Sequence, residues 1–143
     1  MDEGRLTKDD GRRTKENDVD NNELKSRTKK FALRCIKMSD ALPDTPLGRH
    51  IRGQVIRSST SVAANYRAAC LAQSKAGFIA KLSIVVEEVD ETLFWLEIII
   101  EEELLPQTRV ESLMQEADEL TAIFITARKT ARKNRPSSVV NRQ

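Results

Sequence analysis

The chain has 143 residues, of which 39% are hydrophobic and 32% are charged, and its formal net charge is +2. These values fit one soluble domain with a modest core and charged flanks. No apolar run approaches the roughly 20 residues that a membrane-spanning helix needs, and the first residues lack the apolar stretch of a secretory signal. We therefore expect a cytoplasmic protein that does not contact membranes.

The first half of the chain predicts two helices joined by a short turn. The first covers about residues 22–41 and ends at Pro43, with one stripe of residues at spacings of three and four. The stripe consists of Leu24, Thr28, Phe31, Cys35, Met38 and Leu42. The second helix begins where Thr45 can cap it and Pro46 can occupy its first turn, and it continues to about residue 72.

The second half predicts two further helices. Ser74 can cap the third helix, which extends to about residue 105 and is ended by Pro106. Thr108 and Glu111 have the spacing of a capping box at the start of the fourth. The predicted core positions of these two helices are Phe78, Leu82, Val85, Val89, Leu93, Leu96, Ile100, Leu113, Ala117, Leu120, Phe124 and Ala127. No segment has the alternation of a strand.

Short connections make consecutive helices antiparallel neighbours. Residues 22–133 are therefore predicted to form an all-α, up-down-up-down four-helix bundle. The flanks, residues 1–21 and 134–143, combine charged and polar residues with few apolar ones. Such segments cannot bury enough surface to fold, so we predict that both flanks are disordered.

Charge is segregated into blocks along the chain. No acidic residue lies between Asp44 and Glu87 or after Glu119, and no lysine or arginine lies from Leu82 to Gln107. The predicted nucleic-acid-binding residues are the arginines of the second helix, Arg49, Arg52, Arg57 and Arg67. Repeated in an assembly, they would contact phosphates without reading sequence. Alternatively, they neutralise the acidic third helix within or between subunits.

The second and third helices carry apolar residues that one core does not use. The predicted oligomer interface consists of Ile56, Thr60 and Ala63 on the second helix and Phe94, Trp95 and Ile98 on the third. Apolar residues left over after one core is built indicate subunit contacts. These faces alone predict self-association of unstated order.

Residues 54–91 contain a small-residue helix, a serine turn and a helix that begins with an aromatic residue. The positions that define the pattern are Gln54, Arg57, Ser58, Ser61, Val62, Ala64, Asn65, Ser74, Phe78, Leu82 and Glu88. This pattern resembles the four-helix-bundle family of the 23S rRNA intervening-sequence protein (S23-like). It is more distantly similar to the accessory variability protein of diversity-generating retroelements. The resemblance implies a homopentameric ring, with RNA or DNA, or a protein such as a reverse transcriptase, as partners.

Two polar residues fall on the predicted core stripe of the second helix. We expect Ser58 to bond to a carbonyl one turn earlier and Asn65 to bond across to another helix, because buried polar groups need partners. The family pattern continues after the asparagine with Ile-Ala-Glu-Gly, whereas this chain has Tyr66 to Ala69 there. Roles of that glutamate and glycine therefore do not transfer.

Signatures of catalysis are missing from the sequence. His50 is the only histidine, Cys35 and Cys70 have no metal-ligand spacing, and the glycines form no phosphate loop. We expect no enzyme, no cofactor and no metal. Two hypotheses remain: an oligomer that binds nucleic acid through the second helix, or a protein-interaction scaffold or accessory subunit without nucleic-acid contact. They differ in whether the arginines of that helix are free on the surface or already used in contacts at a subunit interface.

Overall fold

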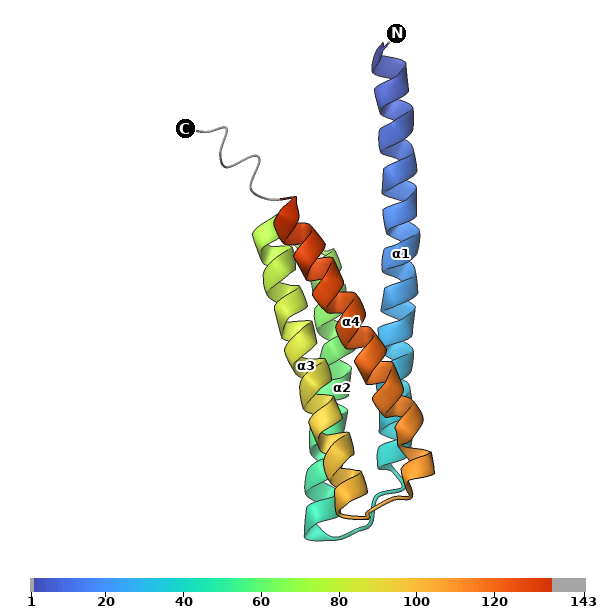
Figure 1. Cartoon of the computed structure of the whole chain (residues 1–143), viewed down its shortest axis with the longest axis vertical. Helices are drawn as coiled ribbons and strands as arrows, with labels where there is room; N and C mark the ends of the chain where they lie inside the picture. Colours follow the sequence, from blue (N-terminus) through green and yellow to red (C-terminus); the bar gives the residue numbers. More distant parts are fainter. Residues whose placement is uncertain (1, 135–143) are drawn as a thin grey trace.

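The computed structural model describes residues 2–134, with side chains described from Asp20 onward. Its elements are α1 (Asp2–Ser39), α2 (Pro46–Cys70), α3 (Lys75–Glu101), the short 3-10 helix η1 (Gln107–Arg109) and α4 (Glu111–Lys133). The helices alternate in direction along the chain, and the described residues contain no strand (Figure 1). The predicted all-α four-helix bundle is confirmed.

The starts of α2 and α3 follow the predicted caps. The Thr45 hydroxyl accepts a hydrogen bond from the Gly48 backbone N–H at 3.1 Å, and the Ser74 hydroxyl accepts one from the Gly77 N–H at 3.0 Å. Each bond satisfies one of the N–H groups that a helix start leaves without a partner. At Gly48 the packing is also close, since a side-chain carbon there would overlap the Pro43 carbonyl oxygen.

The predicted cap of α4 is wrong. Thr108 lies inside η1, and α4 begins only at Glu111 after Val110, with no side-chain cap. Val110 is fully buried, and its N–H bonds to the Gln107 carbonyl at 3.0 Å. The buried valine and the local 3-10 turn therefore set the start of α4, in place of a capping box.

Helix α1 begins at Asp2, so its predicted start at about residue 22 is wrong. Residues 2–21 contain no proline, and a formed helix adds residues at little cost, which explains the extension. Figure 1 shows this part of α1 running beyond the ends of the other helices. The predicted disorder of residues 1–21 stays a prediction. Of the C-terminal flank, only Asn134 lies within the described residues.

A single core lies between the four helices. Its fully buried large side chains are Phe31, Ile51, Val55, Val62, Leu82, Val85, Val89, Leu96, Ile99, Val110, Leu120 and Phe124. Most of the predicted core positions are buried, while Leu24, Phe78, Leu93, Ile100 and Ala127 are only partly buried. Helix α2 packs against α1 and α3, and α4 packs mainly against α3.

Helix α4 leans across the bundle, from α1 at its start to α3 at its end (Figure 1). At its start, Arg27 of α1 donates to both oxygens of Glu116, at 2.9 and 2.6 Å. This pairing raises the pKa of Arg27 and lowers that of the Glu116 carboxyl. At its end, Arg128 donates to the Ser83 hydroxyl of α3 at 3.2 Å. The lean separates α4 from α1 at the end where the chain enters α3.

The buried serine and threonine hydroxyls are hydrogen-bonded, but the half-buried Asn65 differs from the prediction. The Ser58 hydroxyl donates to the Val55 carbonyl at 3.4 Å, as predicted, and lies 2.8 Å from the hydroxyl of Thr92 on α3. Asn65 is half-buried and donates to the Ser61 carbonyl of its own helix at 2.9 Å. The predicted bond from Asn65 to another helix is therefore wrong, because its amide bonds to a carbonyl one turn earlier in α2.

Candidate nucleic-acid interface

Two of the four predicted arginines, Arg49 and Arg52, donate hydrogen bonds to groups near the start of α2. Arg52 donates to the Ser39 carbonyl at 3.1 Å and to the Leu42 carbonyl at 3.0 Å, so it satisfies backbone groups where α1 ends. Arg49 donates to the Asp44 carboxylate at 2.8 Å, and both of these side chains are more than half exposed. Arg52 thus stabilises the fold, whereas Arg49 forms a weak ion pair on the surface.

The other two arginines differ from each other. Arg57 lies between two carboxylates of α3, with Nη1 3.4 Å from Glu88 and Nη2 in contact with Glu91. Arg67 is exposed, and among the described residues it has no ion pair. It lies with Lys29 of α1 along a shallow groove. Of the predicted arginines, Arg67 is therefore the one with neither an ion pair nor a side-chain hydrogen bond among the described residues.

A larger set of basic residues gathers at one end of the bundle. We call this the basic end, and its members are Arg67, Lys75, Lys81, Arg128, Lys129, Arg132 and Lys133. They meet because α2 ends, α3 begins and α4 ends at the same place in an antiparallel bundle (Figure 1). Two blocks about 50 residues apart in sequence thus become one surface. Both blocks are visible in the sequence, but the predicted binding surface is confined to α2.

The charges on α3 run against the preference of a helix. Its first turn contains Lys75 and no acidic residue, and its last turn has no basic residue but ends in Glu101. A helix is stabilised by acidic side chains at its N-terminus and basic ones at its C-terminus, by about 0.3–1 kcal/mol each. The charges therefore destabilise helix α3 at both of its ends. They also place an acidic surface at the opposite end of the bundle from the basic end. We call this the acidic end, and its members are Glu97, Glu101, Glu102 and Glu103.

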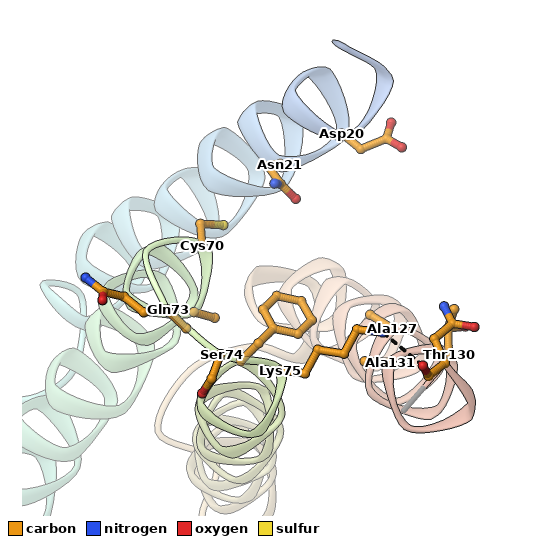
Figure 2. Close-up of a pocket in the computed structure, with 13 residues that line it drawn as sticks. Asp20, Asn21, Cys70, Gln73, Ser74, Lys75, Ala127, Thr130 and Ala131 are labelled. Carbon is orange, nitrogen blue, oxygen red and sulfur yellow. Dashed lines mark hydrogen bonds between the residues drawn. The ribbon is translucent and has the colours of Figure 1, made fainter. Parts of the chain in front are cut away.

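A cavity of about 740 Å³ opens at the basic end, where α4 has leaned away from α1 (Figure 2). Its lining comes from all four helices and the turn between α2 and α3: Asp20, Asn21, Ala69, Cys70, Ala72, Gln73, Ser74, Lys75, Phe78, Ala127, Thr130, Ala131 and Asn134. Lys75 reaches across to α4 and donates to the Asn134 carbonyl at 3.1 Å. The cavity is thus held open on one side by a contact between α3 and α4.

A tyrosine beneath the cavity orients one of its lining side chains. The buried Tyr66 hydroxyl donates to the side-chain oxygen of Asn21 at 3.2 Å. Burial, followed by a hydrogen bond with Cys70, raises the pKa of Tyr66. The phenol therefore stays protonated and remains a donor. Figure 2 shows Asn21 pointing from α1 towards the space between α2, α3 and α4.

The predicted oligomer residues lie on two separate faces. Thr60 and Ala63 line the α1–α2 groove, together with the exposed Leu33. Phe94, half exposed, packs edge-on against Trp95, whose ring in turn meets His50 of α2 with centroids 5.5 Å apart. The complete sets are Ile56, Thr60 and Ala63 on the first face and Phe94, Trp95 and Ile98 on the second. The Trp95 indole N–H is buried without an acceptor among the described residues.

The described residues offer neither a metal-binding cluster nor a membrane-spanning helix. They contain no group of three histidine, cysteine or carboxylate side chains placed to hold a metal ion. Within the same part of the chain, no helix is both long and apolar enough to cross a bilayer. Both cysteines are free, and burial raises the pKa of the Cys35 thiol to about 12, so it stays protonated.

Comparison with known proteins gives a matching family and a similar solved structure. Residues 20–126 match the profile of the 23S rRNA-intervening sequence protein family. A similar crystal structure is that of a protein of unknown function from Bacteroides thetaiotaomicron, described as a member of the S23 ribosomal protein family. The two structures have a TM-score of 0.67 and 33% sequence identity, and the match covers 74% of this chain and 98% of that one. Among curated proteins, none matches significantly. The chain therefore belongs to the 23S rRNA-intervening sequence protein family.

Proposed function

We propose that this chain is a non-enzymatic, self-associating bundle protein that binds the phosphate backbone of nucleic acid through its basic end. The observation that carries the proposal is the convergence of α2, α3 and α4 on one surface without an acidic residue from those segments. Clustered cations release counterions when they contact phosphates, and this drives binding without base recognition.

The basic end is better suited to phosphate than the predicted surface on α2. Lys129, Arg132 and Lys133 are exposed and have no ion pair among the described residues. By contrast, Arg57 is held by two glutamates, and Arg52 is bonded to backbone carbonyls. An arginine that already has acceptors must give them up before it binds phosphate, so it adds little net affinity.

Self-association is proposed from the two apolar faces. The α1–α2 groove is bordered by Lys29 and Arg67, whereas the face around Phe94 is flanked by the exposed Glu87 and Glu97. Two different faces with complementary charge suit a head-to-tail contact, which closes into a ring or continues as a filament. The pentamer is the expectation from the family resemblance.

A protein scaffold without nucleic-acid contact is the second candidate. The observation that favours it is that three of the four predicted arginines, Arg49, Arg52 and Arg57, already bond to other groups of the same chain. On this alternative, the groove or the face around Phe94 receives a different protein.

The test is a titration of labelled single-stranded RNA and duplex DNA at several salt concentrations. We expect log affinity to fall linearly with log salt. The double variant Lys129→Glu, Arg132→Glu should lose about tenfold or more and lower the slope by about 2. The matched control, Lys37→Glu, Arg49→Glu, changes charge equally with two exposed residues at the opposite end.

Two outcomes of this titration would contradict the proposal. Absence of binding at low salt by an intact wild-type protein leaves the scaffold. Equal losses for the two double variants would mean that only net charge matters and that the basic end is no binding surface. The oligomer mass, determined on the same samples, should be unchanged by either double variant and should fall for Phe94→Glu, whose new charge meets an apolar contact.

A further inference from the structure

We propose that the cavity at the basic end receives one unpaired nucleobase, so that the protein prefers single-stranded or looped nucleic acid to a duplex. The inference rests on the proposed function and adds which form of nucleic acid the cavity selects. It is based on three features that lie together at the basic end: the cavity, the aromatic ring of Phe78 in its lining, and the basic residues around its opening. Residues from different helices form them.

The size and the apolar lining of the cavity suit a flat ring. Its volume of about 740 Å³ lies within the range of about 300–1,000 Å³ that small-molecule pockets occupy. Phe78 is only partly buried and lines the cavity, while most of the other apolar residues of the lining are alanines. The small lining residues are Ala69, Ala72, Ala127 and Ala131. An aromatic side chain with open space beside it is the usual platform on which proteins stack a base.

The polar lining suits the edge of a base. Asn21 accepts the Tyr66 hydroxyl with its side-chain oxygen, so its NH₂ group remains as a donor without an acceptor among the described residues. Ser74 lines the same mouth; its oxygen already caps α3 by accepting the Gly77 N–H, and its O–H remains as a donor. Amide and hydroxyl groups match the donors and acceptors along base edges. The hydrogen bond from Tyr66 fixes the orientation of Asn21 before a ligand arrives.

The charges place the base inside and the phosphate outside. Asp20 lines the cavity on the α1 side, and its carboxylate would repel a phosphate group there. The cations lie around the opening and along α4, with Lys75 at the rim and Arg132 and Lys133 exposed beyond it. A nucleotide that enters base first therefore keeps its phosphate near these cations.

This arrangement distinguishes paired from unpaired nucleic acid. Bases in a duplex are stacked and paired, and removing one costs free energy that a single strand or a loop does not need. Both kinds of nucleic acid can contact the cations, but only an unpaired base can enter the cavity. We expect single-stranded RNA to bind about tenfold more tightly than a duplex of the same sequence.

The experiment compares a 12-nucleotide RNA, its duplex and the same strand with abasic positions, all with wild-type protein and two cavity variants. Phe78→Leu keeps an apolar side chain against the core but removes the ring, and Ala131→Leu fills the cavity from α4 without touching the ring's own position. We expect both variants to lose about tenfold for the single strand and to bind the duplex unchanged. Thermal unfolding of both variants checks that they are folded.

The outcomes separate the inference from the proposed function. Equal affinity for the single strand, the abasic strand and the duplex, with no effect of either variant, would overturn the cavity assignment and leave phosphate binding intact. No binding to any of the three by wild-type protein would remove the proposed function itself. If Phe78→Leu is unfolded, Ala131→Leu decides alone, since it adds volume at the wall of an open cavity.

Discussion

The two ends of the bundle are built differently. At the acidic end, Arg52 bonds to carbonyls at the end of α1, and Gly48 packs so closely on Pro43 that no side chain fits. At the basic end, α4 has left α1, the cations of α4 have no carboxylate partner among the described residues, and a cavity opens. The comparison shows that the position of a cation relative to neighbouring helices, more than its density in sequence, determines whether it is free to bind a ligand.

The largest effect is expected in the core near the acidic end. Leu96 is fully buried there, and Leu96→Ala should lower the free energy of unfolding by about 2–5 kcal/mol, because the closely packed surroundings cannot fill the space. Urea unfolding measures this change. Leu71→Ala, at a residue that is 78% exposed beside the basic end, is the control and should stay within about 0.5 kcal/mol. Similar losses at the two positions would mean that the burial of Leu96 adds little to stability.

The next effect concerns the two arginines near the start of α2. Arg52→Ala removes two charged hydrogen bonds from carbonyls and should cost about 2 kcal/mol. Arg49→Ala breaks only a pair between two exposed side chains and should cost less than about 0.5 kcal/mol. Denaturant midpoints of the two variants give the comparison directly. Equal midpoints would show that Arg52 is as dispensable as a surface cation, and it would then be available to phosphate.

A smaller effect should follow pH through the contact between α1 and α4. Arg27 lowers the pKa of the Glu116 carboxyl, so the pair stabilises the fold above the ordinary glutamate pKa, and this stabilisation is lost as pH falls through the lowered pKa. Because both side chains are partly exposed, we expect about 1 kcal/mol. Unfolding of wild type and Glu116→Gln at pH 7 and pH 3 should differ at pH 7 and converge at pH 3. A difference that persists at pH 3 would assign the effect to packing.

Much of the fold could be predicted from sequence because it depends on local signals. Thr45 and Ser74 cap the helices that follow them, and Pro43 and Pro106 lie just after the ends of α1 and α3, so the sequence predicts α2 and α3 with small errors. The start of α4 was missed because the burial of Val110 is a tertiary contact that overrides a local cap signal. Asn65 was misplaced for a related reason: its position on the helix is near the edge of the core stripe.

The candidate site could be predicted only in part. The blocks of charge are visible in the sequence, but the partners of Arg57 come from α3, about 30 residues away, and the carbonyls bound by Arg52 come from the end of α1. Spacing within one helix cannot reveal such partners. The basic end was missed because its members come from three helices, although antiparallel pairing of the predicted helices would have placed their basic ends together. The cavity depends on the lean of α4, which no local pattern indicates.

The smallest effect tests whether the acidic end is optimised for stability. Glu103 follows α3 with a backbone φ of 53°, in the left-handed region that favours glycine at helix ends. Glu103→Gly should therefore stabilise the protein by about 0.5–1 kcal/mol, and it also removes a negative charge near the C-terminus of α3. Glu102→Gly is the matched control, because Glu102 has an ordinary φ of −87° and loses the same charge. If both variants gain equally in thermal unfolding, charge repulsion explains the effect. A gain confined to Glu103→Gly assigns it to the backbone, and the acidic block of α3 then carries little cost in stability.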